Sequence, residues 1–121
     1  MNEKLNEKLS WAVGTSSDKV INLITVKKYV KLGANVNWKD PSGWTSLHHA
    51  SCNENCFEVG KFLIENGANV NLQTNNGDTP LILVSINIRN EENRNKMILL
   101  LCEKGANPTI KDKVIFYFKK I

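Results

Sequence analysis

Apolar residues recur along this chain at helical spacing, in runs that end at a glycine. The first such set lies on one helix face, with charged residues between its members: Leu5, Leu9, Ala12 and Val13. A later run, residues 62–66, ends directly before Gly67. Glycine at this position is typical of a helix end, because it adopts the left-handed conformation without a Cβ clash. The pattern predicts short amphipathic helices separated by turns.

The helix-ending glycines belong to an element that returns at a fixed interval. Gly-Ala-Asn-Val-Asn at residues 33–37 recurs 34 residues later, at 67–71, and again in altered form at 105–109. A second element keeps the same register, since residues 43–48 (Gly-Trp-Thr-Ser-Leu-His) correspond to residues 77–82 (Gly-Asp-Thr-Pro-Leu-Ile). Self-similarity with this period indicates a stack of structural repeats.

The second element predicts where helices begin. A threonine hydroxyl can cap the free amides of a first turn, and proline is tolerated at the first helical position, so Thr79 followed by Pro80 indicates a helix start. Asn, Asp, Gly, Lys and Pro, which favour turns, fill the stretch between each helix end and the next start. Each unit is therefore predicted to run helix, turn, helix and stop, followed by a turn-rich finger.

These residues resemble the ankyrin repeat, a family whose pattern includes G-x-T-P-L-H near the first helix and G-A-x-V-N after the second. Residues 43–71 match it closely, and the matching positions include Thr45, Leu47, His48, Ala50, Glu58 and Val59. The resemblance covers roughly residues 5–112. It implies an all-α fold, an ankyrin-repeat solenoid of stacked helix-turn-helix units with β-turn fingers. The side chains expected to be buried between repeats include Leu47, Ala50, Val59, Phe62 and Leu63. His48 is expected to hydrogen-bond the backbone of neighbouring fingers.

We predict a single ankyrin-repeat domain over residues 1–121. Its parts are expected at about 5–37 (an N-terminal capping repeat), 38–71 (repeat 2), 72–109 (repeat 3) and 110–121 (a degenerate C-terminal cap with Ile115, Phe116 and Phe118). Extra residues relative to the family pattern fall around 14–18 and within 88–95. We expect them to lengthen the loops between the two helices of the first and third repeats, because a longer surface loop costs little.

Composition adds a cellular context. Apolar residues make up 41% of the chain, and no apolar stretch approaches the roughly 20 residues that span a bilayer. The polar start lacks the core of a signal peptide, and three cysteines, Cys52, Cys56 and Cys102, fit free thiols in a reducing compartment. We therefore expect a cytoplasmic monomer without membrane partners. Frequent Asn, Lys and Ile, typical of AT-rich genomes, leave open the host-cell cytosol or nucleus for a chain from a parasite, an intracellular bacterium or a virus.

The resemblance implies a non-catalytic scaffold that binds a partner protein through its finger turns and the concave face of its first helices. The finger positions are Lys39, Pro41, Ser42, Trp44, Gln73, Asn75, Asn76 and Asp78, and the helix positions are Cys52, Asn53, Ile86 and Asn87. Trp44 is the main anchor candidate, because large exposed aromatic side chains are natural anchors at interfaces. Its competing interpretation is packing on a neighbouring finger. Trp38 is expected to pack between repeats.

Two alternatives remain open for the function. The chain can be the interaction segment of a larger effector or adaptor protein, or it can bind nucleic acid or another anionic surface through its C-terminal lysines. The net charge is +4, and the lysines concerned are Lys104, Lys111, Lys113, Lys119 and Lys120. We favour a solvated tail over nucleic-acid binding, because aromatic and basic residues do not alternate as single-strand binders require.

One cluster suggests chemistry beyond binding. The cluster is His48, His49, Cys52 and Cys56. His48 and Cys52, like Cys52 and Cys56, lie four residues apart on one helix face, and zinc takes such ligands. One straight helix cannot wrap four ligands around an ion, so we expect no metal site and no cofactor. His49 and Cys52 could meet as base and nucleophile, but no oxyanion-hole element or phosphate loop accompanies them. We therefore expect no enzymatic activity.

A modification also follows from the resemblance. Ankyrin repeats can be hydroxylated at the asparagine that ends the Val-Asn element, which here means Asn37 and Asn71. Leu63, eight residues before Asn71, fits the common context. Such hydroxylation would be done to the protein by another enzyme, in a cell that has it.

Overall fold

The computed structural model describes residues 2–15, 19–55 and 57–107. Within these ranges the chain forms helices and no strand, so the predicted all-α repeat fold is confirmed. The helices are α1 (Asn2–Thr15), α2 (Lys19–Lys31), α3 (Ser46–Ala50), α4 (Phe57–Glu65), α5 (Pro80–Asn87) and α6 (Glu91–Glu103). Cys56 and the predicted C-terminal cap at 110–121 lie outside the described residues.

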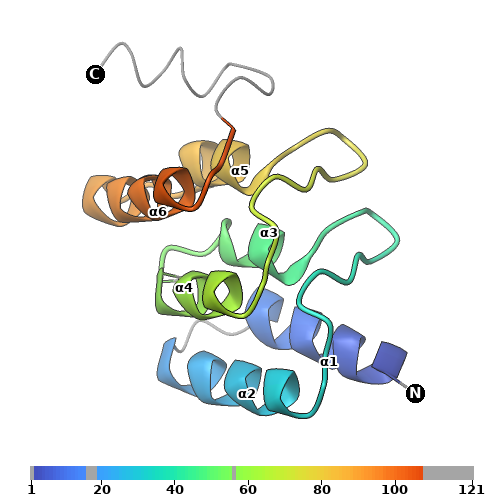
Figure 1. Cartoon of the computed structure of the whole chain (residues 1–121). Coiled ribbons are helices and arrows are strands. Elements are labelled where there is room, and N and C mark those ends of the chain that lie inside the picture. Colours follow the sequence, from blue (N-terminus) through green and yellow to red (C-terminus); the bar gives the residue numbers. More distant parts are fainter. Residues whose placement is uncertain (1, 16–18, 56, 108–121) are drawn as a thin grey trace.

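The helices stack as three antiparallel pairs, α1 with α2, α3 with α4, and α5 with α6 (Figure 1). The first helices α1, α3 and α5 contact one another in order, and so do the second helices α2, α4 and α6. We call the loop at residues 38–45 the first finger and the loop at residues 72–79 the second finger. Both fingers project from the same side of the stack (Figure 1).

The local signals at helix ends act as the sequence predicts. Thr45 caps α3 by accepting the backbone N–H of His48, and Thr79 caps α5, with Pro80 at the start of the helix. The glycines after α2, α4 and α6 have φ angles of 103°, 95° and 93°, and they are Gly33, Gly67 and Gly105. A positive φ strains other residues, so these positions end the helices as expected.

The core runs through the whole stack, and each helix contributes at least one side chain with no exposed surface. One such residue from each helix, in order, gives Leu9, Val26, Leu47, Leu63, Val84 and Leu101. The predicted core residues Leu47, Ala50, Val59 and Leu63 are buried, and Phe62 is half-buried against the same core. These side chains belong to one core that runs through helix pairs in contact with one another, so the repeats depend on one another for stability.

Asparagine side chains join the ends of successive repeats. Three Oδ1 atoms each accept a backbone N–H from the end of a repeat: Asn6 from Asn35 within the first repeat at 2.6 Å, Asn37 from Asn69 of the next repeat at 2.8 Å, and Asn71 from Asn107 of the repeat after that at 2.7 Å. The first of these hydrogen bonds is accepted by a residue of α1, a helix that has no finger before it within the described residues. Asn6 therefore binds the end of the first repeat, as Asn37 and Asn71, which follow the first and second helix pairs, bind the ends of the second and third. The hydroxylation that the resemblance implies for Asn37 and Asn71 stays a prediction.

The prediction of a longer inter-helix loop in the third repeat is wrong. Only residues 88–90 separate α5 from α6, whereas residues 51–56 separate α3 from α4. The extra residues instead extend α6 at its start. Asn90 caps this helix by accepting the backbone N–H of Asn93, and acidic residues occupy the first turn, where the helix dipole favours them.

A carboxylate fixes the short connection before α6. Glu54, in the linker between α3 and α4, accepts the backbone N–H groups of Arg89 and Asn90. These bonds hold the pKa of the Glu54 carboxyl below its ordinary value, with the Arg89 N–H as the main cause. In the first repeat, Gly14 and Thr15 belong to α1, while residues 16–18 lie outside the described residues. The predicted repeat boundaries stay predictions.

Replacing Leu63 by alanine tests the stacked core. Leu63 has no exposed surface, so Leu63→Ala should lower the free energy of unfolding by about 2–5 kcal/mol, through lost burial and the cavity left behind. The matched control is Leu99→Ala on α6, where the leucine is 61% exposed and the loss should stay below about 0.5 kcal/mol. Urea titration measures both values, and equal losses in the two variants would contradict the core assignment.

Candidate functional site

His48 ties the second finger to α3. Its ring is fully buried, and its Nε2 lies 2.9 Å from the carbonyl oxygen of Leu72 and 3.1 Å from that of Asp78. These two carbonyls lie near the start and the end of the second finger. On the other side of the ring, Nδ1 accepts the backbone N–H of Thr45 at 3.0 Å. The expected bond between His48 and a neighbouring finger is confirmed.

The same contacts assign the protonation of His48. A ring nitrogen that accepts an N–H carries no proton, so Nε2 carries the proton of a neutral ring and donates it to the two carbonyls. Burial lowers the pKa of His48 below its ordinary 6.5, and it outweighs the carbonyls of Leu72 and Asp78, which favour the charged ring. Both nitrogens of His48 are therefore engaged, and neither is available to a metal ion.

The two fingers are also joined directly. Asn75, in the second finger, donates its backbone N–H to the carbonyl of Ser42 at 3.0 Å and its side-chain amide to that of Pro41 at 2.9 Å. The Lys39 ammonium lies 3.4 Å from the carbonyl of Gln73. Several predicted partner-binding residues therefore hold the finger surface in shape.

The predicted binding positions differ in how they meet solvent. Side chains that hydrogen-bond the chain's own carbonyls are Lys39, Gln73, Asn75 and Asn87. Exposed positions without such a recorded bond are Pro41, Ser42, Asn76 and Ile86, of which Ile86 is 69% exposed. Half-buried positions are Trp44, Cys52, Asn53 and Asp78. The prediction that Cys52 and Asn53 lie on a first helix is wrong, because α3 ends at Ala50 and both residues belong to the linker that follows it. A role in partner binding stays a prediction for all twelve.

Trp44 packs against the histidines of α3. Its ring centroid lies 5.1 Å from that of His49 and 6.0 Å from that of His48, with the rings tilted. The side chain is half-buried, so part of it supports the first finger and part remains open to solvent. The packing partner is thus the helix that follows the finger.

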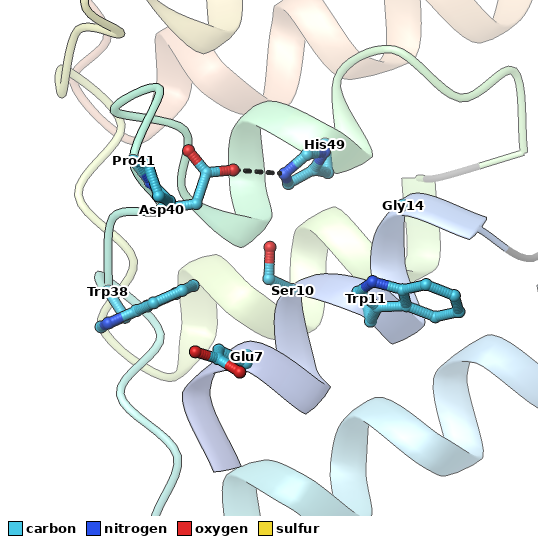
Figure 2. Close-up of a pocket in the computed structure, with 8 residues that line it drawn as sticks. All are labelled: Glu7, Ser10, Trp11, Gly14, Trp38, Asp40, Pro41 and His49. Carbon is cyan, nitrogen blue, oxygen red and sulfur yellow. Dashed lines mark hydrogen bonds and ion pairs between the residues drawn. The ribbon is translucent and has the colours of Figure 1, made fainter. Parts of the chain in front are cut away.

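A cleft between α1, the first finger and α3 brings together residues that the sequence analysis did not expect to meet. Its volume is about 420 Å³, and it is lined by Glu7, Ser10, Trp11, Gly14, Trp38, Asp40, Pro41 and His49. Trp11 is 73% exposed, the most exposed large apolar side chain among the described residues, and Trp38 is half-buried. Figure 2 shows Trp38 and Trp11 on opposite sides of Ser10 and Glu7. We call this site the Trp11–Trp38 cleft.

One sequence signal could have found Trp11. It lies outside the apolar stripe of α1, which consists of Leu5, Leu9, Ala12 and Val13, so a tryptophan here has little reason to be buried. Pro41 and His49 were named in the sequence analysis for other reasons, and no sequence signal places the remaining lining residues beside Trp11. Trp38 comes from a finger and Glu7 from a polar helix face, and only the fold places them beside Trp11.

Cys52 lacks the features of a nucleophile. Burial raises the pKa of its thiol, and the charge of Asp78 raises it further, whereas the reactive form is the thiolate. His49, the proposed base, has its Nε2 3.3 Å from a carboxylate oxygen of Asp40. Within the described ranges, no three His, Cys, Asp or Glu side chains gather in a way that could hold a metal ion.

The anionic-surface alternative depends on residues that the structure leaves out. Of the five lysines in that prediction, Lys104 is described and exposed, while Lys111, Lys113, Lys119 and Lys120 lie outside the described residues. Among the described helices, none combines the length and apolar character required to cross a membrane.

Comparison with known proteins identifies the repeat. A family model described as ankyrin repeats (3 copies) matches residues 9–112. Human protein phosphatase 1 regulatory subunit 27 is 38% identical over 63 residues, which cover 52% of this chain and 40% of that protein. An ankyrin repeat protein of Acanthamoeba polyphaga mimivirus is 37% identical over 87 residues, which cover 72% of this chain and 11% of that protein. Human BCL-6 corepressor-like protein 1 is 36% identical over 75 residues, with coverage of 62% and 4%. The match spans less than half the length of each relative.

Stability should fall as the solution is acidified through the range in which His48 would titrate. Folding lowers the pKa of His48, so below 6.5 the unfolded chain binds a proton that the folded chain resists. The free energy of unfolding should be highest above that pH and should decrease towards the lower folded-state pKa. Urea titrations at about pH 7.5 and about pH 5.5 measure the change.

Two variants separate His48 from other groups. His48→Gln should weaken this pH dependence, whereas His49→Gln should retain the part that comes from His48. If the free energy of unfolding changed equally with pH in wild type and His48→Gln, the buried ring would not be the source of the pH dependence.

Proposed function

The chain belongs to the ankyrin-repeat family, and on that premise we propose that it is a non-catalytic scaffold that binds a partner protein through its finger turns and the concave face of its first helices. Ankyrin repeats generally mediate protein–protein interaction. The observation that carries the proposal is the exposure of side chains on elements that the fold holds rigid. Ile86 on α5 and Trp11 on α1 are 69% and 73% exposed, and both lie on first helices.

Rigid presentation is the mechanism that we propose. The second finger is fixed by His48 and is joined to the first finger through Asn75. A surface that is already ordered loses less conformational entropy on binding than a flexible loop does. The hydrogen bonds between fingers therefore favour affinity for a partner without touching it.

The relatives support a binding role in place of catalysis. One is named a regulatory subunit, and the match covers 40% of it, so its phosphatase does not carry over to this chain as a partner. The raised pKa of Cys52 and the engaged nitrogens of His48 support the same view. The alternative of an interaction segment within a larger effector or adaptor would use the same surface.

A pair of charge-matched variants tests which face works. The first-helix variant carries Ser42→Glu, Asn76→Lys and Ile86→Gln, all at exposed positions of the two fingers and α5. The control variant carries the same kinds of change at exposed positions of the α3–α4 linker and α6: Asn55→Glu, Asn95→Lys and Leu99→Gln. Each triple adds one acidic and one basic residue, so the net charge stays the same.

We expect wild type and the control variant to retain the same protein from a lysate of the native source, and the first-helix variant to lose it. Mass spectrometry identifies the protein, and titration with the purified partner should then show an affinity at least roughly tenfold weaker for the first-helix variant. Circular dichroism establishes that all three chains are folded. Loss of the partner only in the control variant would move the binding site to the second helices.

A further inference from the structure

The Trp11–Trp38 cleft differs in charge from the chain that contains it. The chain carries a net charge of +4, yet the eight lining residues include two carboxylates, Glu7 and Asp40, and neither lysine nor arginine. Lys39 is next to Asp40 in sequence, but its ammonium lies against the carbonyl of Gln73 in the second finger. The cleft therefore combines negative charge with two indole rings.

Asp40 is held in a fixed position at the edge of this cleft. One carboxylate oxygen accepts the backbone N–H groups of Ser42 and Trp44, at 2.9 and 3.0 Å. The other oxygen lies 3.3 Å from Nε2 of His49, as the dashed line in Figure 2 marks. The finger backbone thus orients the charge before any ligand arrives.

The second finger builds the same turn with a neutral side chain at the position equivalent to Asp40. Thr74 lies 34 residues after Asp40, and its hydroxyl oxygen accepts the backbone N–H groups of Asn76 and Asp78 at 3.3 and 3.1 Å. A neutral side chain is therefore sufficient for the turn. The carboxylate of Asp40 gives the first finger a property that the turn itself does not require.

We propose that the Trp11–Trp38 cleft binds an arginine side chain from a basic segment of the partner protein. The proposal rests on the scaffold function above and names the chemistry of the partner. Neither lysine nor arginine lines the cleft itself, and Lys4 and Lys8 line a neighbouring pocket that shares Glu7 and Trp11 with it.

Arginine fits this combination of groups for two reasons. Its planar guanidinium can stack on an indole face, and tryptophan is the aromatic side chain that attracts a cation most strongly. The guanidinium also presents several N–H groups in a rigid fork, which matches a carboxylate better than the point charge of lysine does. Glu7, exposed on α1 with no hydrogen bond or ion pair recorded among the described residues, supplies the carboxylate for this fork.

The three tryptophans of the chain provide the test. In a nitrogen–proton correlation spectrum of the labelled full chain, each indole N–H gives one signal, assigned by single Trp→Phe variants. The probe is a short blocked peptide with one arginine between serines and glycines, and its control has citrulline, the neutral isostere, in place of arginine. We expect the arginine peptide at millimolar concentration to shift the Trp11 and Trp38 signals more than that of Trp44, and the citrulline peptide to leave all three unchanged.

Two substitutions remove the charge and keep the shape. Glu7→Gln replaces an exposed carboxylate by an amide, and Asp40→Thr gives the first finger the residue that makes the same turn in the second. The double variant should bind the arginine peptide roughly tenfold more weakly or not at all. Its indole spectrum without peptide shows whether the fold is kept, and Asp40→Asn serves as a second variant if Asp40→Thr unfolds. Equal shifts from both peptides, no shift from either, or unchanged binding in the folded double variant would overturn the proposal.

The partner identified by affinity capture separates this inference from the scaffold function. If the first-helix variant loses that partner and the folded double variant binds it as wild type does, the scaffold function stands and the arginine site is wrong. If the double variant also loses it, and an arginine-to-glutamine change in the partner has the same effect, both proposals stand.

Discussion

The buried ring of His48 is the contact on which the arrangement of the fingers depends. Its Nε2 binds two carbonyls of the second finger, while its Nδ1 accepts the amide of the threonine that caps its own helix. The ring thus joins a helix start in one repeat to a loop that leads into the next. Burial keeps the ring neutral, and a neutral ring is what allows one nitrogen to accept and the other to donate.

Successive repeats are thus held together by apolar side chains inside the stack and by hydrogen bonds from polar side chains at its edges. Asn37 and Asn71 each accept a backbone N–H from the following repeat and donate their side-chain amide to one of its carbonyls. Asn6 in α1 accepts the backbone N–H of Asn35. Each bond satisfies a backbone group that a loop would otherwise leave to water. Asn75 belongs to the same set, which is why part of the predicted binding surface holds its own shape.

The side chains left exposed differ between repeats in burial and in charge. Trp44 is half-covered by the α3 histidines, whereas Trp11 on α1 stands 73% exposed beside a charged finger. Asp40 has the same turn function as Thr74, with a negative charge in addition. Repeats that share a backbone plan can therefore differ in chemistry at one position: where the second finger has the neutral Thr74, the first has the carboxylate of Asp40.

The sequence by itself determined the repeat register, the helix starts at Thr45 and Thr79, and the helix ends at Gly33, Gly67 and Gly105, because capping and positive φ are properties of single residues and their immediate neighbours. The sequence prediction of a longer loop before α6 missed a local helix start at Asn90, and it had no means of showing the contact from Glu54, 35 residues before the backbone amide of Arg89 that it binds. Only the tertiary structure made Asn75 a link between fingers and brought Trp11, Trp38 and Asp40 around one cleft. Contacts between residues so far apart in the chain arise from the stacking of repeats, so they cannot be predicted from residue spacing within a single helix or turn.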